Sequence, residues 1–172
     1  VTRLTAHLLA ASGLRVGMTL TDGVWVDGHQ IDSGDCSGPK SARKVLMHPD
    51  ADAAVLETAR GGILREGLAF DRCQVAVVTN IGDGDHLGLN HINTVDELAL
   101  VNRVIVATVA PSGCAVLNAG DPRTLAMATA CPGQVILFAT NPRLPAMAAH
   151  RAQGHRIVTI EDGDILATDG AA

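Results

Sequence analysis

Short apolar runs alternate along the chain with segments in which apolar residues recur at helical spacing. Five runs are predicted as strands, at residues 15–21, 53–57, 75–79, 114–117 and 135–138. Valine-rich runs of this length are typical of buried strands in a parallel sheet, and strands that alternate with helices favour right-handed βαβ units. The pattern predicts an α/β fold with a doubly wound, mostly parallel sheet and helices on both faces.

Turn and capping residues place the remaining elements. Helices are predicted at residues 1–11, 39–48, 94–109, 122–130 and 145–153, with a short helix that ends at residue 66. Thr94 with Glu97 three residues later indicates a capping box. Asp27-Gly28 between extended segments favours a hairpin with a type I′ turn, and a second hairpin is predicted around residues 161–164.

The length of 172 residues is that of one ordinary domain, so a single domain over 1–172 is predicted. The helical pattern is already present at Val1, and nothing precedes it to start the helix. We therefore expect the chain to begin inside a larger domain.

Composition narrows the classes of partner. The net charge is −5, and aromatic residues make up only 2%, which leaves neither a basic face nor stacking platforms for nucleic acid. No apolar run approaches the roughly 20 residues that span a bilayer, so no membrane contact is expected. The four cysteines are scattered without a Cys-x-x-Cys pair, which favours reduced thiols and a cytoplasmic protein.

Polar residues follow each predicted strand, where ligands bind in sheets of this kind. The strand ends carry Thr21 and Asp22, Glu57 and Thr58, Asn80 through His86, Asn118 and Asp121, and Thr140 and Asn141. One such ending has little weight, because these residue types also cap helices and form turns. Five endings together predict a site along one edge of the sheet.

The loop after residue 79 carries the densest group of these residues. Asn80, Asp83, Asp85 and His86 lie there among three glycines that allow sharp turns. Carboxylates and an imidazole so placed favour a divalent cation, a general base, or both. The alternatives are turn chemistry for the two aspartates and a loop hydrogen bond for the histidine.

Other candidates also have two interpretations. Glu57 ends a buried strand. An unpaired carboxylate at such a position costs free energy, which favours a functional role for Glu57 over a purely structural one. Asn118 and Asp121 either bind a ligand or cap the helix that follows Pro122. Arg60 either meets an anionic ligand or is solvated. Lys40 has only a loose likeness to a phosphate-binding lysine, because no Gly-x-x-x-x-Gly-Lys-[Ser/Thr] motif occurs in the chain.

Three longer segments together resemble a known family. Residues 56–68 (LETARGGILREGL), 78–89 (VTNIGDGDHLGL) and 115–122 (AVLNAGDP) are similar to the Mur-ligase-like part of the cyanophycin synthetases, as are residues 21–23, 33–42 and 161–163. The resemblance covers nearly the whole chain. It implies the fold of a Mur ligase central domain, related to P-loop NTPases. It also implies an ATP-dependent ligase that attaches arginine to aspartate side-chain carboxylates of a polymer through an acyl phosphate.

The same resemblance implies roles for individual residues. Glu57 and His86 would hold Mg²⁺, and Asn80 would lie beside the phosphates of ATP; these three are the predicted catalytic residues. The nucleotide side would include Asn118, Asp121 and Phe138. The implied partners are ATP, arginine and an aspartate-containing polymer, and a homo-oligomer is compatible with the sequence.

The chain also departs from the family pattern. The family's Gly-Lys-Thr phosphate loop precedes the helix that matches residues 2–11, and a second, carboxy-terminal Mur domain follows the part that the chain matches. The family's metal-holding lysine corresponds to Asn102, and Gly120 stands where aspartate is common. We therefore expect this chain alone to be inactive. The alternatives are a degenerate, non-catalytic nucleotide-binding or assembly module, and a metallohydrolase that uses Glu57 with the aspartates and histidine of residues 83–86.

Overall fold

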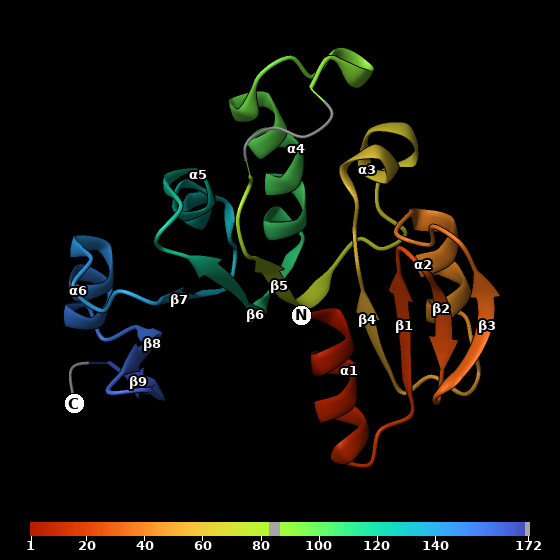
Figure 1. Ribbon diagram of the computed structural model, residues 1–172, viewed down its shortest axis with the longest axis horizontal. Helices are drawn as coiled ribbons and strands as arrows, with labels where there is room; N and C mark the ends of the chain where they lie inside the picture. The colour runs from red at the N-terminus through yellow and green to blue at the C-terminus, as the bar shows by residue number, and fades with distance from the viewer. Residues whose placement is uncertain (83–86, 171–172) are drawn as a thin grey trace. The chain divides into compact units, whose positions relative to one another are not determined.

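The protein has two compact units, Val1–Asp71 and Arg72–Ala172, each with its own sheet and core. The computed structural model describes residues 1–82 and 87–170 (Figure 1). The predicted α/β class with a mostly parallel sheet is confirmed, with the strands divided between two sheets. A single domain over 1–172 stays a prediction, since two compact units can belong to one domain.

The first unit contains a four-stranded sheet in the order β3-β2-β1-β4. Its strands are β1 (Val16–Leu20), β2 (Gly23–Val26), β3 (His29–Ser33) and β4 (Ala53–Leu56). The pairs β1–β2 and β2–β3 are antiparallel, and β1–β4 is parallel. Asp27 and Gly28 have φ of 48° and 78° between β2 and β3. Two successive positive φ angles define the type I′ turn that the sequence predicted.

Three helices accompany this sheet: α1 (Thr2–Ala11), α2 (Pro39–Leu46) and α3 (Arg60–Glu66). Pro39 occupies the first turn of α2, where its missing N–H costs nothing. Val45 of α2 is fully buried and belongs to a small core with Val24 and Cys36. A Cβ at Gly17 of β1 would lie 2.4 Å from Cγ1 of Val45, so close packing of α2 on β1 requires a glycine.

Arg15 and Asp52 join the starts of the parallel strands β1 and β4. The Asp52 carboxylate accepts hydrogen bonds from Nη2 of Arg15 at 2.8 Å, and from Nε and the backbone N–H of Arg15 at 3.0 Å each. The hydrogen bonds from Arg15 lower the pKa of Asp52 to about 2. The pair therefore aligns β4 with β1 at the starts of these strands, whereas Glu57 follows the end of β4.

Asp52 is expected to make the stability of the chain depend on pH. Because its pKa is lower in the folded state, its contribution is full above the unfolded value of about 3.9 and is lost as pH falls toward about 2. Asp52→Asn should flatten the decline of the urea midpoint between about pH 5 and pH 3. Asp71→Asn, at an exposed aspartate, is the control. Parallel curves for wild type and Asp52→Asn would contradict this role.

The second unit contains a five-stranded sheet in sequence order, β5 to β9. Its strands are β5 (Cys73–Val78), β6 (Val109–Asn118), β7 (Gln134–Ala139), β8 (Arg156–Glu161) and β9 (Asp164–Asp169). The first four are parallel, and β9 closes an antiparallel hairpin with β8. Positive φ at Asp162 and Gly163 marks the predicted turn of that hairpin.

Strand β6 is longer than the predicted residues 114–117. It begins at Val109, the residue at which the predicted helix was expected to end, and includes a Pro-Ser-Gly stretch at residues 111–113. The structure accommodates this stretch with a register shift between Cys73 and Val75 of the neighbouring strand. A Cβ at Gly113 would lie 2.3 Å from the carbonyl oxygen of Gln74, which shows how closely the two backbones approach.

The helices of the second unit are α4 (Val95–Ala107), α5 (Pro122–Ala126) and α6 (Pro145–Ala152), with 3₁₀ turns η1 (Leu89–His91) and η2 (Met127–Ala130). Helix α4 has the predicted capping box, in which Thr94 and Glu97 bond each other's backbone. Buried residues from α4, η2 and α6 share one core with the strands. On the opposite sheet face, Val75 and Val77 remain 53% and 43% exposed. Across residues 1–82 and 87–170, none of the helices is both long and apolar enough for a membrane span.

Candidate functional site

The carboxyl ends of β5, β6 and β7 form one edge of the second sheet. The parallel register places Val78 opposite Leu117 and Asn118 opposite Phe138. The polar residues that follow these strands therefore lie at the same edge, which is where sheets of this topology bind ligands. Within the second unit, the predicted gathering of Asn80, Asn118 and Asp121 is what the structure shows.

The segment Thr79–Ile81 is anchored on both sides of Asn80. Nδ2 of Asn118 donates a hydrogen bond to the carbonyl oxygen of Thr79 at 2.8 Å. The backbone N–H of Ile81 donates to Oδ2 of Asp121, also at 2.8 Å. Ile81 itself is buried, whereas Asn80 is exposed and its amide has no partner among the described residues. The two anchors hold the Asn80 backbone while its side chain stays free to contact a ligand.

Asp121 has both oxygens occupied. Besides Ile81, Oδ2 accepts from the buried hydroxyl of Thr124 at 3.0 Å, and Oδ1 accepts from the backbone N–H groups of Arg123 at 2.9 Å and Thr124 at 3.4 Å. Burial raises the pKa of Asp121, but these hydrogen bonds outweigh burial and keep the pKa below its ordinary value. Asp121 is thus the N-cap of α5 and an anchor of the Asn80 segment.

Asn118 and Phe138 also form hydrogen bonds that hold the turn after β6 in place. While Nδ2 of Asn118 contacts Thr79, its Oδ1 accepts from the backbone N–H of Gly120 at 2.8 Å. The carbonyl oxygen of Phe138 accepts from the N–H of Ala119 at 2.9 Å, which ties the turn after β6 to β7. The side chain of Phe138 is half-buried. A nucleotide-binding role for these residues stays a prediction.

Glu57 follows β4 in the first unit. Its backbone N–H donates to the carbonyl oxygen of Thr19 at 3.1 Å, which extends the parallel β1–β4 pairing by one residue. The side chain is half-buried, and its carboxylate has no hydrogen bond or ion pair within the described residues. A carboxylate left free in this way fits the oxygen ligands that Mg²⁺ prefers.

The other predicted metal residue, His86, lies outside the described residues, as do Asp83 and Asp85. The predicted Glu57–His86 pair therefore stays a prediction. Among the residues that are described, no three histidine, cysteine, aspartate or glutamate side chains gather closely enough to hold a metal ion. Glu57 and the free amide of Asn80 are the site residues whose side chains the structure shows to be available.

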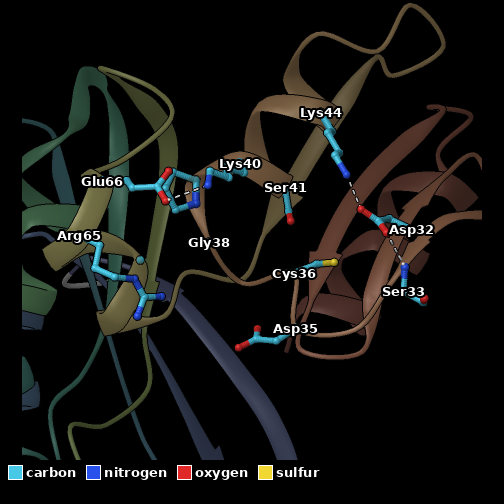
Figure 2. Close-up of a pocket in the computed structure, with 12 residues that line it drawn as sticks. Asp32, Ser33, Asp35, Cys36, Gly38, Lys40, Ser41, Lys44, Arg65 and Glu66 are labelled. Carbon is cyan, nitrogen blue, oxygen red and sulfur yellow. Dashed lines mark hydrogen bonds and ion pairs between the residues drawn. The ribbon is translucent and has the colours of Figure 1, made fainter. Parts of the chain in front are cut away.

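The first unit contains a pocket of about 330 Å³ that was not predicted from the sequence (Figure 2). Its charged lining residues carry both signs and come from β3, α2, α3 and the segment between β3 and α2: Asp32, Asp35, Lys40, Lys44, Arg65 and Glu66. Lys40 pairs with Glu66 at 3.5 Å, and Lys44 donates to Asp32. Lys40 is 80% exposed, so it lies on the rim and does not resemble a buried phosphate-binding lysine.

Two carboxylates of this pocket are held in their charged form. The hydrogen bond from Lys44 lowers the pKa of Asp32, and the hydroxyl of Ser37, at 2.6 Å, lowers that of Asp35. The signal in the sequence was the dense mixture of acidic and basic residues between 32 and 44. Such mixtures are also typical of solvated surfaces, so the charge pattern alone does not indicate a pocket.

Comparisons with known proteins agree with this geometry. The chain is 44% identical over 170 residues to the cyanophycin synthetase of Synechocystis sp., which covers 99% of this chain and 19% of that protein. It is 37% identical over 111 residues to a UDP-N-acetylmuramoylalanine–D-glutamate ligase of Anaeromyxobacter dehalogenans, covering 64% of this chain and 23% of that one. The chain thus spans about a fifth of the length of these curated relatives.

Solved structures show the same fold at low sequence identity. A UDP-N-acetylmuramoyl-L-alanyl-D-glutamate–2,6-diaminopimelate ligase matches 97% of this chain and 36% of its own, with a TM-score of 0.65 and 14% identity. FolC of E. coli, in complex with DHPP and ADP, matches 99% of this chain and 44% of its own, with a TM-score of 0.54 and 15% identity. The Mur ligase middle domain family matches residues 1–165, and the chain belongs to this family.

Proposed function

We propose that this chain is the ATP-binding part of a ligase that forms carbon–nitrogen bonds, as in cyanophycin synthetase. The substrates would be ATP, an aspartate-containing polymer and arginine. The observation that carries the proposal is the Asn80 segment, which is anchored on both sides at the carboxyl ends of parallel strands and whose side-chain amide bonds none of the described residues. The identity of 44% to a cyanophycin synthetase supports the choice of substrates.

The proposed reaction has two steps. An aspartate side-chain carboxylate of the polymer attacks the γ-phosphorus of ATP, the bond to the bridging oxygen breaks, and ADP leaves with an acyl phosphate formed. The α-amine of arginine then attacks the acyl carbon and loses a proton, phosphate leaves, and an amide bond is formed. Positioning and charge stabilisation carry most of the rate in phosphoryl transfer, so a rigid frame is the chief requirement.

The residues of the chain would divide this work. Asn80 donates its amide N–H to a phosphate oxygen, and its position is fixed by Asn118 and Asp121. Glu57, with a free carboxylate, would hold Mg²⁺ together with His86. Bound Mg²⁺ would supply charge neutralisation between the phosphates and the incoming carboxylate. Phe138 and the turn after Asn118 would lie on the nucleotide side.

Calorimetric titration with MgATP tests the proposal. Asn80→Ala should weaken binding about tenfold or more, because it removes a hydrogen bond to a charged group, and the unfolding midpoint should stay unchanged. Gln74→Ala is the matched control, since Gln74 is an exposed amide near the start of β5, the strand that Asn80 follows. The titration is done on this chain and on a form extended at Val1 by the family's Gly-Lys-Thr loop. Equal affinities for wild type and Asn80→Ala would refute the proposed site.

A second candidate is a non-catalytic nucleotide-binding or assembly module. Asn102 favours it, because a neutral amide on α4 cannot form the carbamate that the family's lysine provides. Asn102→Lys is made in a whole ligase that contains this chain and the Gly-Lys-Thr loop. It should raise the rate of ligation severalfold if the amide of Asn102 is what disrupts the second metal site. Unchanged turnover would show that it is not. Absence of MgATP binding in the loop-extended form would favour an assembly module.

A further inference from the structure

Arg60 has a buried nitrogen without a hydrogen-bond partner in the described part of the chain. It begins α3, in the segment Glu57-Thr-Ala-Arg-Gly-Gly62. Nη1 of Arg60 is shielded from solvent and forms no hydrogen bond with any described residue. Glu57, three residues earlier, forms no ion pair with it. The guanidinium is therefore partly enclosed without being neutralised by any of the described residues.

The start of α3 is fixed against the start of α2. The N–H of Ala59 donates to the carbonyl oxygen of Ser37 at 3.0 Å. Gly62 is buried, and a Cβ there would lie 3.0 Å from Cδ of Pro39 and 3.1 Å from Cα of Gly38. A glycine at 62 lets the two helix starts meet at this distance. The backbone that carries Arg60 is thus held by contacts on both sides of it.

An enclosed guanidinium without a counter-ion is costly. Arginine keeps its charge under all ordinary conditions, so it cannot reduce the cost by losing a proton. Other arginines of the chain show what pairing looks like: Arg15, Arg123 and Arg156 each bond an aspartate. A buried donor that lacks a partner calls for a ligand that supplies one. The ligand that suits a guanidinium is an oxyanion, which it can bind through two parallel N–H groups.

We propose that Arg60 binds an oxyanion of the ligase reaction, either a phosphate or a carboxylate. This inference rests on the proposed function and deepens it, because it adds a cationic residue to the segment that carries Glu57. A phosphate would be the group transferred from ATP, and a carboxylate would be the aspartate side chain of the polymer. In both cases Arg60 offsets negative charge and fixes the orientation of the bound group.

Urea unfolding of the 172-residue chain tests this in a buffer that contains only chloride as anion. The probes are inorganic phosphate in one arm and a short, terminally blocked peptide of aspartates in the other. The midpoint of the wild type should rise in at least one arm, because a ligand that binds only the folded state stabilises it. Arg60→Gln should lose this rise and should have a midpoint in chloride equal to or above that of the wild type.

Arg43→Gln is the matched control, since Arg43 is exposed on α2, has no ion pair among the described residues and should keep the rise. A rise with phosphate alone assigns Arg60 to the phosphoryl group, and a rise with the peptide alone assigns it to the polymer. No rise in the wild type in either arm would overturn the proposal, and so would a full rise in Arg60→Gln.

Arg60→Lys provides the comparison if Arg60→Gln does not fold. It keeps the charge but loses the planar fork, so the probe concentration for a half-maximal rise should increase about tenfold. An unchanged concentration would contradict the proposal. Calorimetry of Asn80→Ala with MgATP reports separately on the proposed function, so failure of one inference can be told from failure of the other.

Discussion

Replacement of Asp121 by alanine is expected to lower the free energy of unfolding by about 3 kcal/mol. Loss of the N-cap of α5 accounts for about 1 kcal/mol. The buried hydroxyl of Thr124 and the N–H of Ile81 would each lose an acceptor, which together cost about 2 kcal/mol. Urea unfolding measures the sum. Because Ile81 is no longer held, MgATP affinity should fall as well.

Asp96→Ala is the control for this prediction. Asp96 bonds Arg123 at 2.6 Å but is 80% exposed, so its loss should cost less than about 1 kcal/mol. Equal losses for the two variants would contradict the anchoring role of Asp121. The pKa of Asp121 is lowered in the folded state, so its stabilisation is full above the unfolded pKa of about 3.9 and is lost as pH falls through the folded value. The difference between wild type and Asp121→Ala should therefore shrink below about pH 4.

Replacement of Glu57 by glutamine is expected to reduce ligation about 100-fold or more in the whole ligase that contains this chain. A neutral amide is a poorer ligand for Mg²⁺, and the charge stabilisation that the metal gives to the transition state is worth several kcal/mol. The unfolding midpoint should stay unchanged, because the carboxylate makes no bond within the described residues. Partial recovery at raised Mg²⁺ would show that metal binding is what the substitution weakens.

Glu66→Gln serves as the matched control for Glu57. Glu66 is a glutamate of the same unit that pairs with the exposed Lys40 at 3.5 Å and lines the pocket, and no metal role is assigned to it. Its activity should remain near that of the wild type. Full activity of Glu57→Gln, or a loss of activity that only follows a loss of stability, would contradict the metal role of Glu57.

Local signals in the sequence were sufficient to predict most helices, strands and turns. The type I′ turn at Asp27-Gly28 and the capping box at Thr94 depend on residues adjacent or three apart, and both are found in the structure. Strand β6 was underestimated because Pro111 and Gly113 argue against a strand, and only pairing with β5 accommodates them. The division of the strands into two sheets depends on long-range pairing, which local patterns do not encode.

The residues that form the candidate site could be predicted from the sequence, but the contacts among them could not. The residue types at the strand ends marked Asn80, Asn118 and Asp121. The sequence could not show that two of them hold the third, because Asp121 reaches Ile81 across 40 residues. Nor could it decide whether Arg60 is solvated, since burial of one nitrogen depends on how α3 packs against α2.

Amide NMR mapping can locate the nucleotide, which we propose binds at the Asn80 segment. The isotopically labelled chain is titrated with MgATP up to millimolar concentrations, so that weak binding is still detected. The largest shifts should fall at residues 79–82 and 118–121, and they should vanish in Asn80→Ala but persist in Gln74→Ala. Shifts concentrated elsewhere, or equal shifts in Asn80→Ala, would contradict this proposal.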